Sequence, residues 1–338
     1  MRKRSPAVQL DSVIDALLVA LQPEPEPHTS PALAQLMPIA RALSLLPRPA
    51  FKLALKSDLH RRSSMTESAA RTQSSSGAAH FRRPGFSNIA PYFLVNGASR
   101  FLEFLISAFE ATEHIRVPRP DGSIMHAEVA IGDSDVIELA DANEQYPPRA
   151  MATHLYVPDA DATYARALQS GAIAIYAPSD EHPSGDRWGA ARDPFGNVWY
   201  IATPRGWAPG PEGLRAVQPY LHLRDAHNLI PFVEAGLGAE VLGIHKSQEG
   251  LVLHATISIA NATFELDEAH GETLPTPAYL HVYVPDTDAL YAQALRAGAT
   301  GVTPPSDAPY GDRAATVKDP FGNTWFLATY RGANQIKT

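Results

Sequence analysis

The sequence contains no cysteine among its 338 residues. The absence of thiols excludes disulfides, cysteine nucleophiles and cysteine-based zinc sites, so a metal ion would need His, Asp, Glu or Gln ligands. Charged residues make up only 19% of the chain and apolar residues 45%, which excludes wholesale disorder. No run reaches the ~18 uncharged apolar residues that a membrane span needs, so we expect no membrane-spanning segment.

Positive charge is scarce except at the start of the chain. Residues 1–84 contain 12 Lys/Arg and 6 Asp/Glu, whereas the other 254 residues contain 16 and 30. The first 21 residues superficially resemble a signal peptide, but Asp11 and Asp15 interrupt the apolar stretch and no small-residue cleavage site follows. We therefore expect a cytoplasmic protein. The basic segment has no aromatic or Arg-rich readout surface, so we expect no nucleic-acid partner.

The N-terminal quarter of the chain differs from the rest in pattern as well as charge. Apolar residues recur at helical spacing over 10–21, 32–46 and 50–60, which predicts an all-α appendage over residues 1–62. This appendage would pack on the body or on another subunit, so a homodimer or a partner bound through these helices stays open. Residues 63–87 are rich in Ser, Ala and Thr without periodicity, and we predict a flexible linker that tolerates proteolysis.

The remaining sequence repeats itself. Residues 152–203 (ATHLYVPDADATYARALQSGA…GDRWGAARDPFGNVWYIAT) match residues 278–329 (AYLHVYVPDTDALYAQALRAGA…GDRAATVKDPFGNTWFLAT). The preceding segments also correspond, because PYFLVNGASRFLEFL at 91 matches PYLHLRDAHNLIPFV at 219. The repeat predicts two tandem domains, 88–204 and 216–331. Within each domain a unit of strand, helix and three short strands occurs twice, which predicts an α+β fold.

The motifs VPDADATYARALQSGA and GDRWGAARDPFGNVWYIAT, with their second copies, resemble the vicinal oxygen chelate superfamily, which includes glyoxalase I, bleomycin-resistance proteins and extradiol dioxygenases. The motif GDR…DPFGN…W is most similar to that of the PhnB-like branch. The resemblance implies that the paired βαβββ units of each domain form a cupped sheet covered by helices. It also implies a divalent metal on His, Gln or Glu from the first and last strands of each unit.

The ligand positions that the resemblance implies are mostly occupied by residues that cannot bind a metal. They fall on Ala90, Glu138, Ala152 and Tyr200 in the first domain, and on Gln218, Glu265, Tyr279 and Phe326 in the second. One or two oxygen ligands do not hold a divalent ion firmly, so we expect a degraded metal site. A divalent metal stays open in the second domain only, on Gln218, Glu265 and His281.

Side chains alternate along strands, which indicates the residues that face each cup. The candidate catalytic residues are His281, Glu265, His222, His154 and Glu138, and the candidate substrate-binding residues are Tyr220, Tyr283, Tyr92, Tyr156, Tyr200 and Phe326. We expect the pairs His154–Glu138 and His281–Glu265. Such pairs could act as acid and base, as a shifted metal site or as ligand-binding groups, or could be buried histidines satisfied by a carboxylate without any chemistry.

We expect the second domain to contain the working cup, because Gln218, His222, Glu265 and His281 share the inward parity there. The arginines of the two GDR motifs, Arg187 and Arg313, could aim at an anionic substrate or pair with acidic neighbours. Two functions stay open. One is an enzyme (lyase, isomerase or dioxygenase-like) acting on a small oxygenated molecule. The other is a metal-free small-molecule binding protein of the bleomycin-resistance type. A third, weaker hypothesis makes one domain a structural copy that supports the other.

Overall fold

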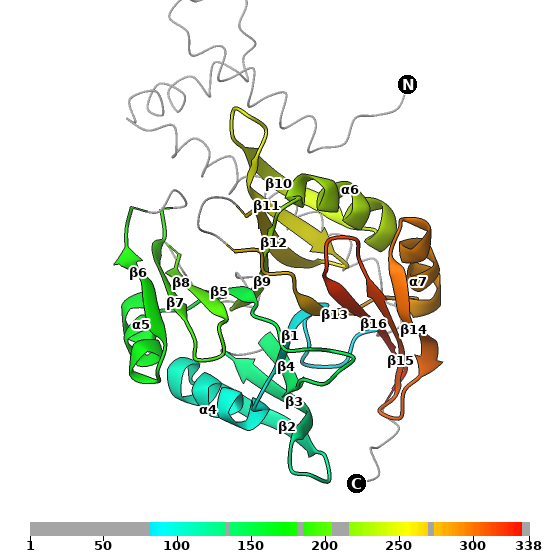
Figure 1. Cartoon of the computed structure of the whole chain (residues 1–338), viewed down its shortest axis with the longest axis horizontal. Helices are drawn as coiled ribbons and strands as arrows, with labels where there is room; N and C mark the ends of the chain where they lie inside the picture. The colour runs from blue at the N-terminus through cyan, green and yellow to red at the C-terminus, as the bar shows by residue number, and fades with distance from the viewer. Residues whose placement is uncertain (1–80, 133–134, 182–184, 205–215, 270–273, 333–338) are drawn as a thin grey trace, which may run out of the picture. The chain divides into compact units, whose positions relative to one another are not determined.

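The computed structural model of the chain describes residues 81–132, 135–181, 185–204, 216–269 and 274–332 (Figure 1). The predicted N-terminal helices at 1–62 and residues 63–80 of the predicted linker lie outside the described residues. No helix within the described ranges is long and apolar enough to cross a membrane.

Four units follow one another in the described part, each with a strand, a helix and three further strands. The first comprises β1 (Ile89–Val95), α4 (Ala98–Phe109), β2 (Thr112–Pro118), β3 (Ile124–Ile131) and β4 (Asp135–Asp141). The second comprises β5 (Ala152–Tyr156), α5 (Ala160–Gln169), β6 (Ile173–Ser179), β7 (Arg187–Arg192) and β8 (Val198–Thr203). The third comprises β9 (Val217–Leu223), α6 (Ala226–Leu237), β10 (Glu240–Lys246), β11 (Val252–Ile259) and β12 (Ala262–Glu268). The fourth comprises β13 (Tyr279–Tyr283), α7 (Thr287–Arg296), β14 (Thr300–Asp307), β15 (Asp312–Lys318) and β16 (Thr324–Tyr330).

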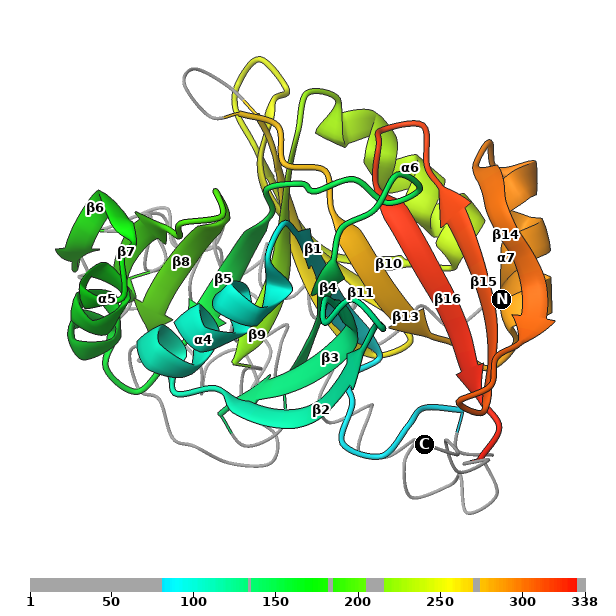
Figure 2. The ribbon, with the colours of Figure 1, turned by 60° about the horizontal axis from the view of Figure 1, so that its bottom comes forward.

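These strands form two mixed sheets of eight strands. Sheet A has the order β14-β15-β16-β13-β1-β4-β3-β2, and sheet B has the order β10-β11-β12-β9-β5-β8-β7-β6. At the centre of sheet A, β1 pairs antiparallel with β13, and at the centre of sheet B, β5 pairs antiparallel with β9. Figure 2 shows the consequence: the last unit (orange and red) continues the sheet of the first unit (cyan and green).

The α+β class and the tandem βαβββ units are therefore as predicted, but the composition of the cups is not. We expected each repeat to form its own cup, and this is wrong, because each sheet takes one unit from each repeat. The physical reason lies in the helix-covered faces. Within a repeat the two helices pack side by side, α4 on α5 and α6 on α7, so the edges of β1 and β5 are left to pair with the other repeat (Figure 1).

Aromatic side chains hold the two units of each repeat together beneath the helices. Trp199 of β8 is fully buried, stacks on Phe93 of β1 at 5.4 Å between ring centroids and contacts Phe109 of α4 at 4.6 Å. In the second repeat Trp325 meets Phe264 at 5.8 Å. Each aromatic pair adds about 0.5–1.5 kcal/mol beyond its buried area. Both tryptophans thus belong to the core beneath the helices.

The DPFGN motifs are turns that lead into the last strand of a repeat. Asp193 accepts hydrogen bonds from the backbone of Phe195 and Asn197 and from the indole nitrogen of Trp199. Gly196 follows with φ +93°, a left-handed conformation that glycine adopts without strain. The buried aspartate therefore joins the turn to the aromatic core.

Candidate functional site

The faces of the two sheets that point away from the helices are named face A and face B after their sheets. On both faces a histidine is hydrogen-bonded to a glutamate of the other repeat. Nδ1 of His154 lies 2.9 Å from Oε2 of Glu265 on face B, and Nδ1 of His281 lies 2.5 Å from Oε1 of Glu138 on face A. The expected pairs His154–Glu138 and His281–Glu265 are therefore wrong, because the repeats exchange units between the sheets.

The exchange of units also regroups the positions at which the family would place metal ligands. Face A holds Ala90, Glu138, Tyr279 and Phe326, and face B holds Ala152, Tyr200, Gln218 and Glu265. Gln218, His222 and Glu265 share face B as expected, but His281 lies on sheet A, so the predicted set of Gln218, Glu265 and His281 is not brought together. His154 takes the place on face B that we had given to His281.

One polar chain on face B centres on Glu265. Its carboxylate accepts from Nδ1 of His154 and forms an ion pair with Nε2 of His254 at 3.7 Å. Burial raises the pKa of Glu265, but the charges and hydrogen bonds of His154 and then His254 outweigh it and hold the pKa below its ordinary value. His154 is only 8% exposed, and its Nε2 is one of four buried side-chain atoms among the described residues without a hydrogen-bond partner.

A second chain on face B begins at Tyr200, which occupies a position where the family would place a metal ligand. The hydroxyl of Tyr200 donates to Nε2 of His222 at 2.7 Å, and Nδ1 of His222 donates to Asp267 at 2.5 Å. Tyr220 donates to the other oxygen of Asp267 at 3.4 Å. Burial raises the pKa of both tyrosines, with Asp267 adding to the effect, so both phenols stay protonated near neutral pH.

Aromatic rings form a wall beside these polar chains. Trp188 of β7 stacks on Tyr200 with 5.6 Å between ring centroids, and Tyr176 of β6 lies 5.7 Å from Trp188. Tyr220 lies 5.3 Å from Tyr200, and Tyr156 stacks on His154 at 4.1 Å. Flat rings with polar groups at their edges suit an aromatic guest that also bears oxygen atoms.

Face A has a different polar network. Burial lowers the pKa of His281, but the neighbouring charge of Glu138 outweighs it, so the pKa of this histidine is raised. Glu128, directly opposite Glu138 in the sheet, accepts from Nε2 of His126, and Nδ1 of His126 accepts from Tyr92 at 3.1 Å. The predicted residue Tyr283 donates to the buried Asp312 at 3.1 Å. Among the described residues of face A no Tyr–His–Asp chain forms, because Leu94 and Ala140 stand where face B has His222 and Asp267.

Chain segments outside the sheet cover part of face A. Arg83 forms an ion pair with Glu128 at 2.6 Å, and Phe86 packs its edge on Tyr283. The carbonyl of Phe81 accepts from the backbone of Tyr330, so residues 81–88 lie along the fourth unit. From another side Tyr146 packs on Tyr279 and Phe326. We name residues 81–88 the strap.

The residues at the family's metal positions do not fit a divalent ion. On face B, Glu265 is engaged by two histidines, the side-chain oxygen of Gln218 accepts from Thr263, and Ala152 offers no donor. On face A, Glu138 is the one carboxylate among Ala90, Tyr279 and Phe326. A divalent cation needs several convergent oxygen or nitrogen ligands, which these positions do not supply.

One cluster of potential ligands lies elsewhere in the described ranges, formed by Asp225, His227 and Glu268. Two of these residues are exposed, and the third, Glu268, accepts from the backbone of Val252. The equivalent Asp141 of the first unit accepts from the backbone of Ile124 in the same way. The cluster is thus accounted for by the local fold.

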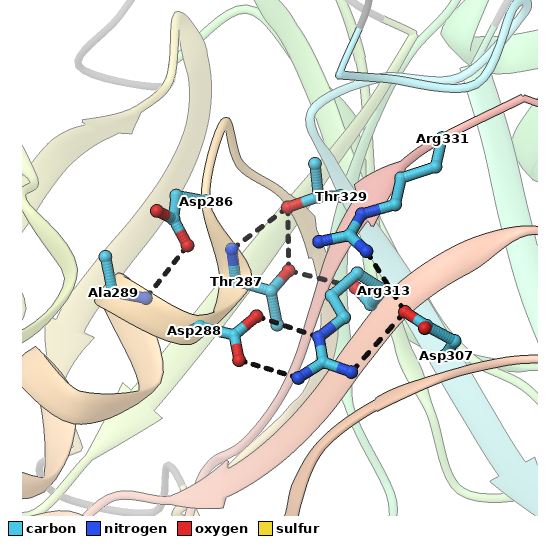
Figure 3. Close-up of polar contacts among 8 residues, drawn as sticks. All are labelled: Asp286, Thr287, Asp288, Ala289, Asp307, Arg313, Thr329 and Arg331. Atoms are coloured by element: carbon cyan, nitrogen blue, oxygen red, sulfur yellow. Dashed lines mark hydrogen bonds and ion pairs between the residues drawn. The ribbon is translucent and has the colours of Figure 1, made fainter.

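The GDR arginines do not face the cups. Arg187 forms a bidentate pair with Asp161 of α5, and Arg313 forms the same pair with Asp288 of α7 (Figure 3). Arg313 also approaches Asp307 at 3.4 Å. Of the two interpretations, pairing with acidic neighbours is the one that holds. These pairs are exposed to solvent and therefore contribute little to stability.

Several residues of these networks were not among the predicted site residues. Asp267 lies two residues beyond Glu265 with the same inward parity, so the alternation alone could have found it. His254 and His126, which stand near the starts of equivalent strands, are ion-paired or hydrogen-bonded on the cup side. Nothing in the sequence indicated that Arg83 contacts a candidate site, because it lies in a segment without hydrophobic periodicity.

The sequence and the fold are similar to those of known proteins. The family model described as Glyoxalase/Bleomycin resistance protein/Dioxygenase superfamily matches residues 86–201 and 221–327. An uncharacterized protein from Mycobacterium tuberculosis is 35% identical over 126 residues, which are 34% of this chain and 74% of the relative. An uncharacterized protein from Mycobacterium bovis is also 35% identical over 126 residues, covering 34% of this chain and 82% of the relative. The crystal structure of glyoxalase I from Zea mays superposes with a TM-score of 0.56 at 16% identity, covering 71% of this chain and 92% of that one. This last likeness concerns the fold alone.

Proposed function

The chain belongs to the glyoxalase/bleomycin resistance protein/dioxygenase superfamily, and from this premise we propose that face B binds a small oxygenated organic molecule and exchanges a proton with it through His154. The proposed reaction class is a proton transfer at a carbon next to a carbonyl, without a metal ion. The observation that supports it most is the buried Nε2 of His154, which has no hydrogen-bond partner while Nδ1 is held by Glu265.

The pairing with Glu265 makes His154 suitable as a general base. Because Nδ1–H donates to the carboxylate, the lone pair of the neutral ring lies on Nε2. A proton accepted at Nε2 produces an imidazolium next to a carboxylate whose pKa is lowered, so the new charge is stabilised. A ligand that places a C–H or O–H group at Nε2 would also satisfy a buried nitrogen that otherwise costs free energy.

The proposed step balances without any oxidant or reductant. The C–H bond breaks, its proton moves to Nε2 of His154, and its electron pair moves to the carbonyl oxygen, giving an enolate. Tyr220 is the proposed donor to that oxygen, because its 3.4 Å hydrogen bond to Asp267 is the longest in the network and can be redirected. Return of a proton from Nε2 to the same carbon restores the carbonyl group and the neutral histidine, with a solvent hydrogen in place of the original one; at a stereogenic carbon, return on the opposite face gives the epimer.

Face B is preferred over face A because the strap covers part of face A. Arg83 and Phe86 lie against Glu128 and Tyr283, and the backbone of the strap is hydrogen-bonded to β16. Face B carries the two hydrogen-bonded chains around Glu265 and His222, together with the ring of Trp188. We therefore keep the preference for one working cup, now composed of units two and three.

Binding without turnover is the second candidate function. It is favoured by the saturation of the polar groups on face B, where Tyr200, Glu265 and Asp267 already have partners and Nε2 of His154 is the free buried atom. A sequestering protein needs only the aromatic wall and one hydrogen-bond acceptor.

The test uses 2-hydroxyacetophenone in deuterated buffer, because it joins an aromatic ring to exchangeable protons beside a carbonyl. Proton NMR follows the loss of these protons, and a change in tryptophan fluorescence, to which Trp188 beside Tyr200 contributes, reports binding. We expect enzyme-dependent exchange that falls about 100-fold or more in His154→Gln, as for loss of a general base. The matched control is His281→Gln, the equivalent histidine of face A, which should exchange normally.

The outcomes separate the two candidates. Saturable binding without exchange supports the binding protein and rejects the base. Exchange that survives in His154→Gln but is lost in His281→Gln would move the site to face A and contradict the proposal. Absence of both binding and exchange across a panel of aryl ketones, phenols and enols would overturn the proposal for face B.

A further inference from the structure

A cavity of about 320 Å³ opens where β1 ends and α4 begins. It is lined by residues of the first two units rather than by the residues of face B, among them Asn96, Arg100, Pro148, Arg149, Pro194 and Phe195. Its lining thus includes two arginines together with prolines and one aromatic ring. Volumes of this size are typical of small-molecule sites.

The two arginines are not neutralised by the protein. Among the described residues, neither Arg100 nor Arg149 forms an ion pair with a carboxylate, although the chain carries eight more acidic than basic residues. Arg116, Arg187 and Arg313 show the usual alternative, because each is paired with an aspartate or glutamate. Two unpaired cations at one cavity of an acidic protein form a local positive site.

Arg149 is held in a fixed position. Its guanidinium donates to the backbone carbonyl of Gly322 at 2.8 Å and lies 4.3 Å above the ring of Tyr279. These contacts use one nitrogen and one face of the guanidinium, so further N–H donors remain for a ligand. A preorganised guanidinium loses less entropy when it binds a carboxylate.

The second repeat provides an internal comparison. Aligned by the starts of α4 and α6, Arg100 corresponds to Asn228, and aligned by the starts of β5 and β13, Arg149 corresponds to Thr276. Asn228 donates to Asp225, and the hydroxyl of Thr276 accepts from the backbone of His222. The second repeat therefore uses these positions for its own hydrogen bonds, so the fold itself does not require arginines there.

We infer that this cavity, the Arg100/Arg149 pocket, binds a small organic carboxylate. The carboxylate would lie against the two guanidinium groups, and the apolar body against Pro148, Pro194 and Phe195. Guanidinium forks match the planar geometry of a carboxylate, which supports a bidentate contact. The pocket is independent of the proposed function, since it shares no residue with face B.

The probe is 4-fluorobenzoate, titrated against the full chain and observed by fluorine NMR. We expect saturable binding that weakens about tenfold in Arg100→Gln and in Arg149→Gln, as for the loss of a hydrogen bond to a charged group. Arg296→Gln removes an exposed arginine at the end of α7 and is the matched control, with affinity unchanged. The neutral 4-fluorobenzamide should bind at least tenfold more weakly than the acid.

The same titration defines what would contradict the inference. If 4-fluorobenzamide binds as tightly as the acid, the pocket is apolar and does not recognise an anion. If the affinity for 4-fluorobenzoate is unchanged in Arg100→Gln, the Arg100 guanidinium does not contact the ligand. If inorganic phosphate binds and 4-fluorobenzoate does not, the site takes an anion without an apolar body, and the inference is wrong. Arg149→Gln could lose stability with its Gly322 contact. Arg100 is exposed, so Arg100→Gln should fold normally and still tests the inference. The affinity for 4-fluorobenzoate should also fall as the salt concentration rises. Exchange at face B should be normal in Arg100→Gln.

Discussion

Nδ1 of His154 and Oε2 of Glu265 are 2.9 Å apart, although 111 residues separate them and they belong to different repeats. His281 and Glu138 repeat the relationship across 143 residues. Each of these two pairs thus takes its histidine from one repeat and its glutamate from the other, so each candidate site is assembled at the contact between repeats. The function proposed for face B consequently requires both repeats to be docked.

The exchanged pairing predicts which double substitutions are coupled. We expect His154→Gln and Glu265→Gln to show a coupling free energy of about 1–3 kcal/mol, because they remove the two halves of one buried contact. His154→Gln combined with Glu138→Gln should be additive within about 0.5 kcal/mol. Urea unfolding of the single and double variants measures both values. Coupling between His154 and Glu138 instead would contradict the arrangement of the sheets.

The buried aspartates of the DPFGN turns should matter far more for stability than exposed ones. Asp319 accepts from the backbone of Phe321 and Asn323 and from the indole of Trp325, so Asp319→Ala leaves several buried donors without an acceptor. We expect a loss of about 3–5 kcal/mol in the free energy of unfolding. Asp307→Ala, which removes exposed ion pairs with Arg313 and Arg331, is the control and should cost less than about 1 kcal/mol.

Strand alternation predicted the inward side of most candidate residues because it is a local property of the chain. His154, Gln218, His222 and Glu265 all lie on face B. The partner of each residue was beyond local reasoning. Whether β1 pairs with β5 or with β13 depends on how helices and aromatic cores of two similar repeats dock. Strand alternation determines which face of the sheet a residue occupies, whereas the pairing of the sheet edges determines which residues lie opposite it. The positions of the histidines on the inner faces were therefore predicted, and their glutamate partners were not.

A single glycine in β7 allows its neighbour strand to come close. A Cβ added at Gly189 would lie 2.9 Å from the backbone nitrogen of Pro178 and 3.0 Å from the carbonyl of Tyr176, and backbone atoms cannot move aside easily. Gly189→Ala should therefore destabilise the protein by about 1–3 kcal/mol. The equivalent residue of the second repeat is Ala315, as the shared register opposite Ile201 and Leu327 shows. Ala315→Gly is the control, with an expected cost of about 1 kcal/mol or less.

The strap should contribute to stability through one buried charge. Arg83→Ala leaves Glu128 with His126 as its remaining partner, so we expect a loss of about 1–3 kcal/mol, below the range for fully buried pairs because Arg83 is partly exposed. Arg82→Ala changes an exposed neighbour and should have little effect. Thermal unfolding of the two variants gives the comparison. Equal melting temperatures would show that the strap does not stabilise face A.

The two His–Glu pairs should give the protein a stability optimum in mildly acidic solution. The folded-state pKa of Glu265 lies below 4.5, because His154 and His254 outweigh the effect of burial. Its contribution is therefore fully present above about pH 4.5 and is lost as the pH falls through the folded-state pKa. The folded-state pKa of His281 lies above 6.5, because Glu138, with Asp312 and Glu128, outweighs burial. That contribution is fully present below about pH 6.5 and is lost as the pH rises through the folded-state pKa.

Both contributions are complete between about pH 4.5 and 6.5, and there we expect the largest contribution of these pairs to the free energy of unfolding. Urea unfolding at a series of pH values tests this in three proteins. The wild type should lose stability on both sides, Glu265→Gln should flatten the acid side, and His281→Gln should flatten the alkaline side. His245→Gln, which changes an exposed histidine of β10, is the control and should follow the wild type. An alkaline side that is unchanged in His281→Gln would show that the pair with Glu138 does not link protonation to folding.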